Sequence, residues 1–399
     1  MIPAEEIRSK AEEYYDYTVS NLARLVQTKS YSGAEQQAAE LVAELCRAAG
    51  LDEVRIDGLG NVIARVGAGP RMLAIDGHID TVEVGDPAQW ARDPFCGTVE
   101  GGYLHGRGAS DQKGGAACMI TAARILKELS YAEQFSVYFT FTIMEEDCDG
   151  MCWRYLIEQE KLVPEFAVST EPTSLGLYRG QRGRMELELQ FAGLSAHGSA
   201  PERGDNAAYK AARAALAIEE LNERLEPDTD GFLGKGTLVV SQMQAHGPSQ
   251  CAVPDQARLY VDRRLTWGET KDSAIAELRE ICGSNLKEIS VPRYDKPSWK
   301  GTVFNQELYF PTWKTAEDHT LVQAGVQAFE ALYGQPPRVD KWTFSTNGVA
   351  IAGYHEVPCI GLGPGDEDQA HAPNECIRLS DLVPATAFYA ALPYALSAP

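Results

Sequence analysis

Two histidines and a group of acidic residues are the side chains in this sequence whose types and spacing indicate chemistry. His78 and Asp80 end the stretch AIDGHID, and in an extended chain two residues this far apart point to the same side. A carboxylate beside an imidazole is the partner that orients a metal-binding histidine. The pair is weak evidence alone, because most histidines near strand ends are ordinary surface or core residues. It gains weight from the acids and the second histidine further along the chain.

Four other segments carry clustered polar side chains. They are GRGASDQKGG with Asp111, MEEDCDG with Glu145 and Glu146, STEPT with Glu171, and AHAPNE with His371. Most of these segments follow an apolar stretch, and sites in open α/β sheets form beyond the carboxyl ends of strands. Imidazoles and carboxylates suit divalent cations, and two cations about 3.5–4 Å apart need a bridging carboxylate. An acid left over beside a ligand is then free to act as a base.

Glycines and cysteines offer two alternative sites. Gly106-Arg-Gly108 permits a phosphate-binding loop, but the segment lacks a Lys-Ser/Thr pair and a complete GxGxxG motif. Cys148 and Cys152 lie near the acids, but their spacing is not that of a usual zinc pair, so we expect structural thiols.

Length and composition limit the class of protein. A chain of 399 residues is long enough for two domains, and a net charge of −21 argues against nucleic acid or an anionic membrane as partner. There is no apolar run of about 18 residues, and the acidic N-terminus lacks the apolar core of a signal peptide. Nine cysteines at irregular spacing are typical of reduced thiols. We therefore predict a cytoplasmic protein.

The order of the predicted elements indicates an α/β domain interrupted by an α+β insertion. The apolar periodicity predicts helices over about residues 4–28, 35–49, 114–130 and 152–160, and again over 318–333 and 380–391. Strands, among them the apolar run FSVYFTFTIM at 135–144, alternate with these helices up to about residue 183, as in a sheet covered on both faces. MELELQFAG then alternates strictly, which predicts a strand with one face in water, and it is followed by two helices and further strands. The α/β pattern resumes afterwards. We predict one domain from residues 1–183 and 299–399, and a second from residues 184–298.

The motifs GHIDTV, GRGASDQKGG, EED, TEPT and HAPNE resemble, in order and spacing, those of the dinuclear zinc amidohydrolase and exopeptidase family. This family includes acetylornithine deacetylase, succinyl-diaminopimelate desuccinylase, aminoacylase-1 and the glutamate carboxypeptidases. The resemblance covers nearly the whole chain. YRGQRGRME, SAHGSAPERGDNA, DRRLTWGET and KWTFSTNG are most similar to the YgeY-type, selenium-metabolism-linked branch. The implied fold is a mixed-sheet catalytic domain with an inserted α+β lid and dimerisation domain.

The resemblance implies a role for each residue of the motifs. It implies two divalent cations, zinc with cobalt or manganese as alternatives. The first cation is expected on His78 and Glu171, the second on Glu146 and His371, with Asp111 bridging them, Asp80 orienting His78, and Glu145 as general base. The peptide bond from Asp111 to Gln112 is expected to be cis, as is typical of the family.

Residues of the lid are expected to complete the site. His197 in SAHGSAP matches a family histidine that stabilises the oxyanion, often from the partner subunit. Arg264 matches the Asp-x-Arg pattern at the end of a lid strand and is the better candidate for binding a substrate carboxylate, since a guanidinium binds carboxylates in a bidentate manner. Asn347 stands where many relatives have Asp and is a second candidate for substrate contact.

Other arginines remain open candidates. Arg179, Arg182 and Arg184 form a basic cluster at the domain junction that lines a substrate path or forms hinge ion pairs. Arg203 is a further possibility. Cys251 replaces an Asn of many relatives, so side-chain specificity does not transfer from them.

These features predict a metal-dependent hydrolase that cleaves an amide bond of an N-acyl or N-carbamoyl amino acid or a short peptide. The alternatives are a dipeptidase or carboxypeptidase of the same family, and a catalytically silent homologue that binds metal or a small ligand. The expected partner is a small molecule with a carboxylate. We also expect a homodimer through an edge strand of the lid.

Overall fold

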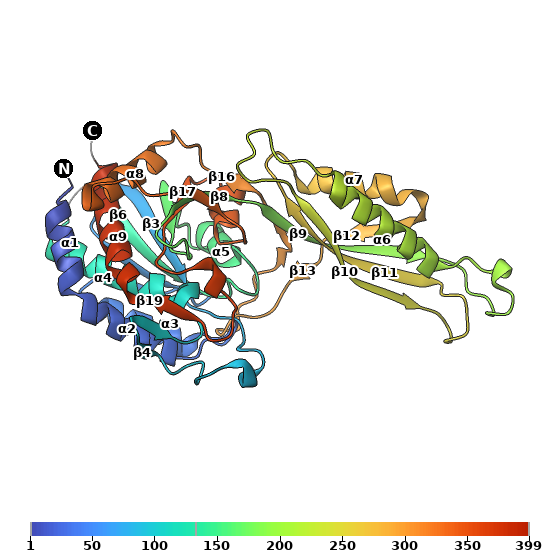
Figure 1. Ribbon diagram of the computed structural model, residues 1–399, viewed down its shortest axis with the longest axis horizontal. Helices are drawn as coiled ribbons and strands as arrows, with labels where there is room; N and C mark the ends of the chain where they lie inside the picture. The colour runs from blue at the N-terminus through green and yellow to red at the C-terminus, as the bar shows by residue number, and fades with distance from the viewer. Residues whose placement is uncertain (1, 132–133, 398–399) are drawn as a thin grey trace.

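The computed structural model describes residues 2–131 and 134–397. It contains one large mixed sheet and a second, antiparallel sheet that extends away from it to the right in Figure 1. Each sheet has its own hydrophobic core. The predicted fold class, an α/β domain with an inserted α+β segment, is confirmed.

The large sheet has the strand order β1-β2-β6-β3-β7-β18-β8-β16, and β17 also pairs with β8. Its strands are β1 (Glu53–Ile56), β2 (Val62–Val66), β3 (Arg71–His78), β6 (Phe135–Thr142), β7 (Phe166–Ser169), β8 (Leu177–Gln181), β16 (Trp313–Lys314), β17 (Val339–Trp342) and β18 (Cys359–Gly361). The central strands β6, β3, β7 and β18 are parallel. They are strongly apolar and buried because helices cover the sheet.

The helices of this domain are α1 (Ala4–Glu13), α2 (Tyr15–Gln27), α3 (Gln36–Ala48), α4 (Gly114–Glu128), α5 (Met151–Glu158), α8 (Thr320–Tyr333) and α9 (Leu382–Leu396). Helix α9 packs against α4, α8 and α1, and this group lies at the left of Figure 1. A small sheet of β4 (Thr98–Glu100), β5 (Tyr103–His105) and β19 (Cys376–Arg378) ties the loop before α4 to the C-terminal part of the chain. Apart from their ends, these helices follow the sequence-based expectations, except that the helix expected over residues 4–28 is divided at Tyr14.

The second sheet has the order β10-β11-β9-β12, with β15 also paired to β9. Its elements are β9 (Gly183–Ala192), β10 (Thr237–His246), β11 (Gln256–Leu265), β12 (Leu286–Ser290), β15 (Tyr309–Phe310), α6 (Ala207–Arg224) and α7 (Lys271–Cys282). The buried residues of β9 alternate with half-buried ones, since α6 and α7 cover only one face. A short hairpin of β13 (Arg293–Tyr294) and β14 (Gln306–Glu307) lies in the segment that returns to the large sheet.

Within the described residues, no helix combines the length and the apolar character that a membrane span needs.

Candidate metal centre

The site lies where the parallel strands β3, β6 and β7 end side by side. His78 is the last residue of β3, Glu145 and Glu146 follow β6, and Glu171 follows β7. Because these strands run in the same direction and are neighbours, their carboxyl ends meet at one edge of the sheet. Asp111 reaches this edge from the loop that precedes α4. The apolar strands thus bring residues 93 positions apart in the sequence to one place.

Asp111 lies between the two histidines. Its Oδ1 atom is 3.0 Å from His78 Nε2, and its Oδ2 atom is 3.5 Å from His371 Nε2. Glu146 Oε2 is 2.8 Å from the same His371 nitrogen. One carboxylate therefore faces both imidazoles, which is the arrangement a bridging ligand needs. The peptide bond from Asp111 to Gln112 is cis, as expected from the resemblance.

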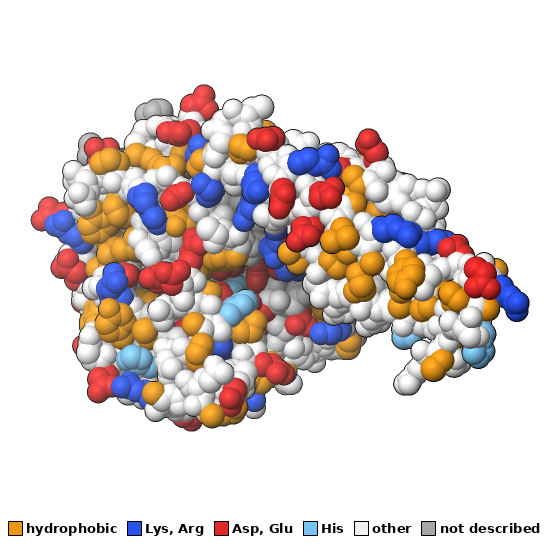
Figure 2. All heavy atoms as spheres, turned by 45° about the vertical axis from the view of Figure 1, so that its right-hand side comes forward, with side chains coloured by type: hydrophobic (Ala, Val, Ile, Leu, Met, Phe, Trp, Pro, Cys, Tyr) orange, Lys and Arg blue, Asp and Glu red, His pale blue; other side chains and the backbone are white. Residues whose placement is uncertain are grey.

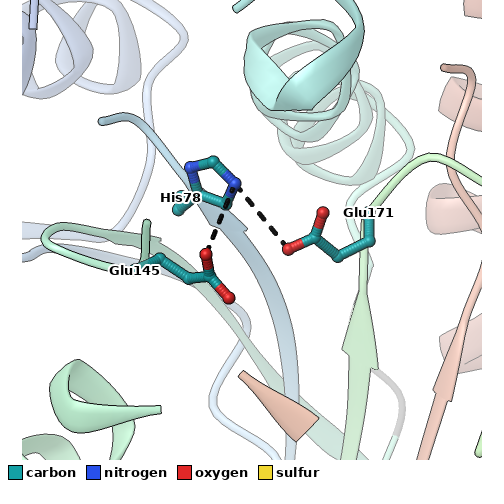
Figure 3. Close-up of side chains that lie close together, drawn as sticks. All are labelled: His78, Glu145 and Glu171. Atoms are coloured by element: carbon teal, nitrogen blue, oxygen red, sulfur yellow. Dashed lines mark ion pairs between the residues drawn. The ribbon is translucent and has the colours of Figure 1, made fainter. Parts of the chain in front are cut away.

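Glu145 and Glu171 approach His78 from either side, as Figure 3 shows. Their nearest oxygens lie 3.9 Å and 3.7 Å from His78 Nε2. The other oxygen of each carboxylate, Glu145 Oε1 and Glu171 Oε2, is buried and accepts no hydrogen bond from the residues that the structure describes. His78, Glu145 and Glu171 form one group with ligand atoms close enough to hold a cation, and His78, Asp111 and Glu146 form another.

Burial shifts the acid–base properties of these groups. It raises the pKa of Glu146 to about 7 and holds the pKa values of Glu145 and Glu171 well above their usual range, although His78 opposes the shift. Burial also disfavours a charged His78, but the carboxylates of Asp111 and Asp80 outweigh it and raise the pKa of His78. Buried acids gathered this closely repel one another, and bound cations relieve that repulsion. The residues present thus fit a site for divalent cations.

Asp80 contacts more than His78. His78 Nδ1 is 3.0 Å from the Asp80 carbonyl oxygen and 3.5 Å from its carboxylate. The carboxylate accepts hydrogen bonds from the backbone N–H groups of Glu145 and Glu146, at 3.2 and 3.1 Å, and from Ser32 Oγ at 2.7 Å. Asp80 therefore positions the turn that carries both glutamates as well as the imidazole.

Glu375 is a site-organising residue that the sequence analysis did not single out. Its buried carboxylate accepts hydrogen bonds from the backbone N–H groups of Gly108, Ser110 and Asp111, at 2.9–3.0 Å. It also pairs with Arg107 at 2.8 Å, and Arg107 donates a 3.3 Å bond to the His371 carbonyl. Glu375 thus holds the Asp111 loop against the His371 loop. Its place in HAPNE, four residues after His371, was the available signal.

We expect Glu375→Gln to weaken cation binding by about 10–100-fold, the usual effect of disturbing residues that orient ligands. Each carboxylate oxygen accepts two hydrogen bonds, and the amide NH₂ that replaces one of them accepts neither, so the Asp111 loop loses part of its anchor in either orientation of the amide. Titration calorimetry with zinc measures the affinity, and Glu165→Gln, an exposed acid at the opposite end of β7, is the matched control. Wild-type affinity in Glu375→Gln would contradict the assignment.

Asn347, a candidate for substrate contact, is buried and does not line the cavity formed by Asp111, Glu145 and His371. It is 1% exposed. Its Nδ2 donates to Asp76 Oδ2 and Thr142 Oγ1, at 2.9 and 3.1 Å. Its Oδ1 accepts from Gly150 N–H and Cys152 Sγ, both at 3.1 Å. These bonds occupy the side chain completely, so Asn347 serves the packing between β3, β6 and α5.

The two candidates from the second sheet differ in position. Arg264 lines the same cavity of about 330 Å³ as Asp111, Glu145 and His371, and it pairs with Asp262 at 2.8 Å. His197 is exposed, accepts a 3.1 Å bond from Ser199 N–H and does not line this cavity. Figure 2 looks toward the hollow between the two parts of the molecule, where acidic, basic and histidine side chains gather.

The open arginine candidates are also placed. Arg184 lines the cavity, whereas Arg179 is buried and donates to the Thr315 carbonyl at 2.9 Å. Arg182 bonds to the Lys235 carbonyl at 2.9 Å, and Arg203 is exposed beside Glu202. Of these four, Arg184 is therefore the one placed to meet a ligand.

Comparison with known proteins identifies the family. The model of peptidase family M20/M25/M40 matches residues 74–395. The chain is 48% identical to protein YgeY of Escherichia coli (strain K12), over 98% of this chain and 97% of that protein. It is 32% identical to the succinyl-diaminopimelate desuccinylase of Magnetococcus marinus, over 57% of this chain and 62% of that enzyme.

Among solved structures, the YxeP protein of Bacillus subtilis, described as a dinuclear metal binding peptidase from the M20 family, shares the fold. The TM-score is 0.71 at 15% identity, covering 96% of this chain and 98% of YxeP. The fold, the clustered metal-type ligands and the family match agree with one another. The chain therefore belongs to peptidase family M20/M25/M40 and is a metallohydrolase.

Proposed function

We propose that the protein uses two divalent cations to hydrolyse an amide bond of an N-acyl or N-carbamoyl amino acid or of a short peptide. The observation that carries this proposal is the position of Asp111, whose two oxygens face His78 and His371 separately. In the proposed arrangement His78 and Glu171 hold one cation, Glu146 and His371 hold the other, and Asp111 bridges them. Zinc suits these ligands, and cobalt or manganese would fit the same set.

Bound cations supply Lewis acidity, which lowers the pKa of water toward neutrality and polarises a carbonyl oxygen. Glu145 is the acid of the cluster left free for proton transfer. It accepts a proton from the attacking water and then donates that proton to the leaving nitrogen, as one positioned base commonly does. Burial raises the pKa of its carboxyl and so favours the first of these steps, because it stabilises the protonated form. The Asp80 carboxylate keeps Glu145 in place by accepting a hydrogen bond from the Glu145 backbone N–H.

We further propose that residues 184–298 act as a lid on the domain formed by residues 1–183 and 299–399. Arg264 would bind the substrate carboxylate from the lid. His197 would stabilise the oxyanion after closure or from a partner subunit, since it lies outside the cavity of this single chain. Strand β10 forms an edge of the second sheet, with Val239 and Met243 exposed, and offers a surface for a homodimer.

We expect light scattering at micromolar concentration to give the mass of a dimer. Pairing across a twofold axis would bury the exposed apolar side chains of β10 and satisfy its free backbone groups. Val239→Lys should shift the mass toward the monomer, with Glu165→Gln as a control that keeps the dimer. A monomeric mass for the wild-type chain would contradict the dimer.

A metal analysis combined with a substrate panel tests the proposed function. The panel contains N-acyl amino acids, N-carbamoyl amino acids and dipeptides, and amine release is measured with and without a chelator. Two bound cations and chelator-sensitive release support the proposal, and preference within the panel separates a deacylase from a dipeptidase or carboxypeptidase. Two bound cations without turnover would favour a catalytically silent homologue. A cytoplasmic location stays part of the proposal and is tested by cell fractionation.

We expect stabilisation by zinc to grow as the pH rises from about 5.5 to about 8. Glu146, with a pKa of about 7, and the similarly shifted Glu145 and His78 bind more protons in the folded metal-free protein than in the unfolded chain. Their contribution to stability is therefore full at low pH and is lost as the pH rises through the folded pKa values. The loss from Glu146 alone is about 3 kcal/mol of unfolding free energy. Zinc competes with these protons for the same side chains, so it stabilises the folded protein most at the higher pH, where the side chains are deprotonated.

Thermal unfolding with and without zinc measures this effect. Groups distant from the centre titrate equally in both forms, so their effects cancel in the difference. A zinc-induced rise in melting temperature that is larger at the lower pH would contradict the expectation.

A further inference from the structure

Two acidic residues that line the cavity, Asp149 and Glu367, have no part in the proposed metal chemistry, and Glu367 already accepts a 2.9 Å hydrogen bond from Thr343 Oγ1. Asp149 lines the cavity together with Glu145 and His371, in the turn before α5, and it is 5% exposed. Its Oδ2 atom is buried and receives no hydrogen bond within the described part of the chain. A buried carboxylate oxygen left unpaired costs free energy, and a donor from a ligand would remove that cost.

Arg184 faces this carboxylate from the first residues of β9. Arg184 Nε lies 3.8 Å from Asp149 Oδ2, which is close enough for attraction but too long for a hydrogen bond. The Nε atom is itself buried and has no hydrogen-bond acceptor among the residues described. The guanidinium lies 4.6 Å from the centre of the Phe310 ring, within cation–π distance, and its Nη2 donates a 3.4 Å bond to Glu186. The pair thus has one unused hydrogen-bond acceptor, Asp149 Oδ2, and one unused donor, Arg184 Nε.

A second guanidinium stands beside the first. Arg184 and Arg264 are direct partners in the register between β9 and β11, and both line the cavity. Asp262 already holds Arg264 with bonds of 2.8 and 3.3 Å. This part of the cavity lining therefore presents two cations that suit a carboxylate and one anion that suits an ammonium group.

We propose that Asp149 and Arg184 form a specificity subsite for a substrate whose carboxylate lies beside a free ammonium group. The ammonium binds Asp149, and the carboxylate binds Arg184 and Arg264. Because the two protein charges are 3.8 Å apart, the two substrate charges must be carried on the same or adjacent carbons. The substrate class is an amide that keeps an intact α-amino-acid end, such as a side-chain-acylated diamino acid. This inference rests on the proposed amide hydrolysis.

The alternative is an ion pair that only joins the two parts of the molecule. Asp149 belongs to the turn after β6 and Arg184 to β9 of the second sheet, so their attraction also links the two sheets. In that case loss of the Asp149 charge would lower the melting temperature and would affect all substrates alike. In the proposed case it affects only substrates that carry the ammonium group.

Matched substrate pairs test the subsite with the zinc-loaded full chain. The panel is a homologous series of side-chain-acetylated diamino acids ending at Nε-acetyl-lysine, each paired with the analogue that lacks only the α-ammonium group, such as 6-acetamidohexanoate. Nα-acyl amino acids and dipeptides are included. We expect kcat/KM to be at least about 10-fold higher for the ammonium-bearing member of the preferred pair, the usual size of a charged hydrogen bond.

Asp149→Asn should abolish this preference by lowering kcat/KM for the ammonium-bearing member to the level of its deamino analogue, mainly through KM. Asp147→Asn is the matched control, because Asp147 lies in the same turn but pairs with Tyr294 and Lys296 outside the cavity. It should keep the preference.

Three results overturn the inference. Equal rates on both members of every pair in the wild type overturn the subsite and leave the proposed function standing. An equal loss of rate on both members in an Asp149→Asn protein with a lowered melting temperature has the same meaning. The wild-type comparison needs no variant, so the test survives misfolding of Asp149→Asn. Absence of hydrolysis across the whole panel, with both cations bound, overturns the proposed function and this inference together.

Discussion

Replacing Glu145 with Gln is expected to lower kcat by about 10²–10⁴-fold while both cations stay bound, because the amide cannot accept a proton from water. Glu145 is buried at the carboxyl end of β6, and the assigned ligands of both cations are other residues. The substitution keeps the shape of the side chain, and burial already favours the uncharged form of this carboxyl. The folded structure should therefore tolerate the change.

Steady-state kinetics on the best substrate and metal analysis of the same preparation check this prediction together. Glu165→Gln removes an identical carboxylate where it pairs with Arg71, at the start of β7 and away from the metal centre, and should keep full activity. Near-wild-type turnover by a two-metal Glu145→Gln enzyme would remove Glu145 from the role of base. Loss of a cation in that variant would instead show that Glu145 acts as a ligand.

Asp111→Asn is expected to release both cations and to abolish activity at least as completely as Glu145→Gln. The variant loses the carboxylate whose two oxygens face the two histidines separately, and the neutral amide cannot offset the charge of two cations. His371→Ala, by contrast, should lose the second cation first, because His78 and Glu171, the assigned ligands of the first cation, are unchanged.

Dialysis against limiting zinc followed by metal analysis measures the number of bound cations. Wild-type protein stripped by a chelator and reloaded with zinc is the control, and its activity should return. Asp111→Asn should not recover under the same conditions. Retention of two cations by Asp111→Asn would mean that another group bridges them.

Local sequence patterns predicted much of the fold because they report burial along single elements. The alternation in MELELQFAG predicted that β9 has one wet face, and the apolar run FSVYFTFTIM predicted β6. Strand β8, with the sequence LYRGQ, was not predicted. Its polar residues are buried only because distant segments supply partners, such as the Thr315 carbonyl for Arg179 and Ser345 for Gln181.

The helix expected over residues 4–28 illustrates a second limit. Its apolar residues follow the helical period on both sides of Tyr14, so periodicity alone does not reveal the division there. The Tyr14 side chain contacts Glu128 and lies 4.3 Å from the guanidinium of Arg124 on α4. These partners come from more than 100 residues away.

The sequence by itself predicted which residues carry the chemistry. Metal-type ligands are His, Asp or Glu, and short motifs after apolar strands are expected at one sheet edge, so residue type and local pattern selected His78, Asp111 and His371 as candidates, and the family resemblance implied their roles. Only the tertiary structure decided what surrounds them. It buried Asn347 against Asp76, tied Glu375 to the Asp111 loop and set Asp149 opposite Arg184. Each of these contacts joins residues far apart in the chain, and no local pattern encodes which distant side chain fills a buried hydrogen-bonding position.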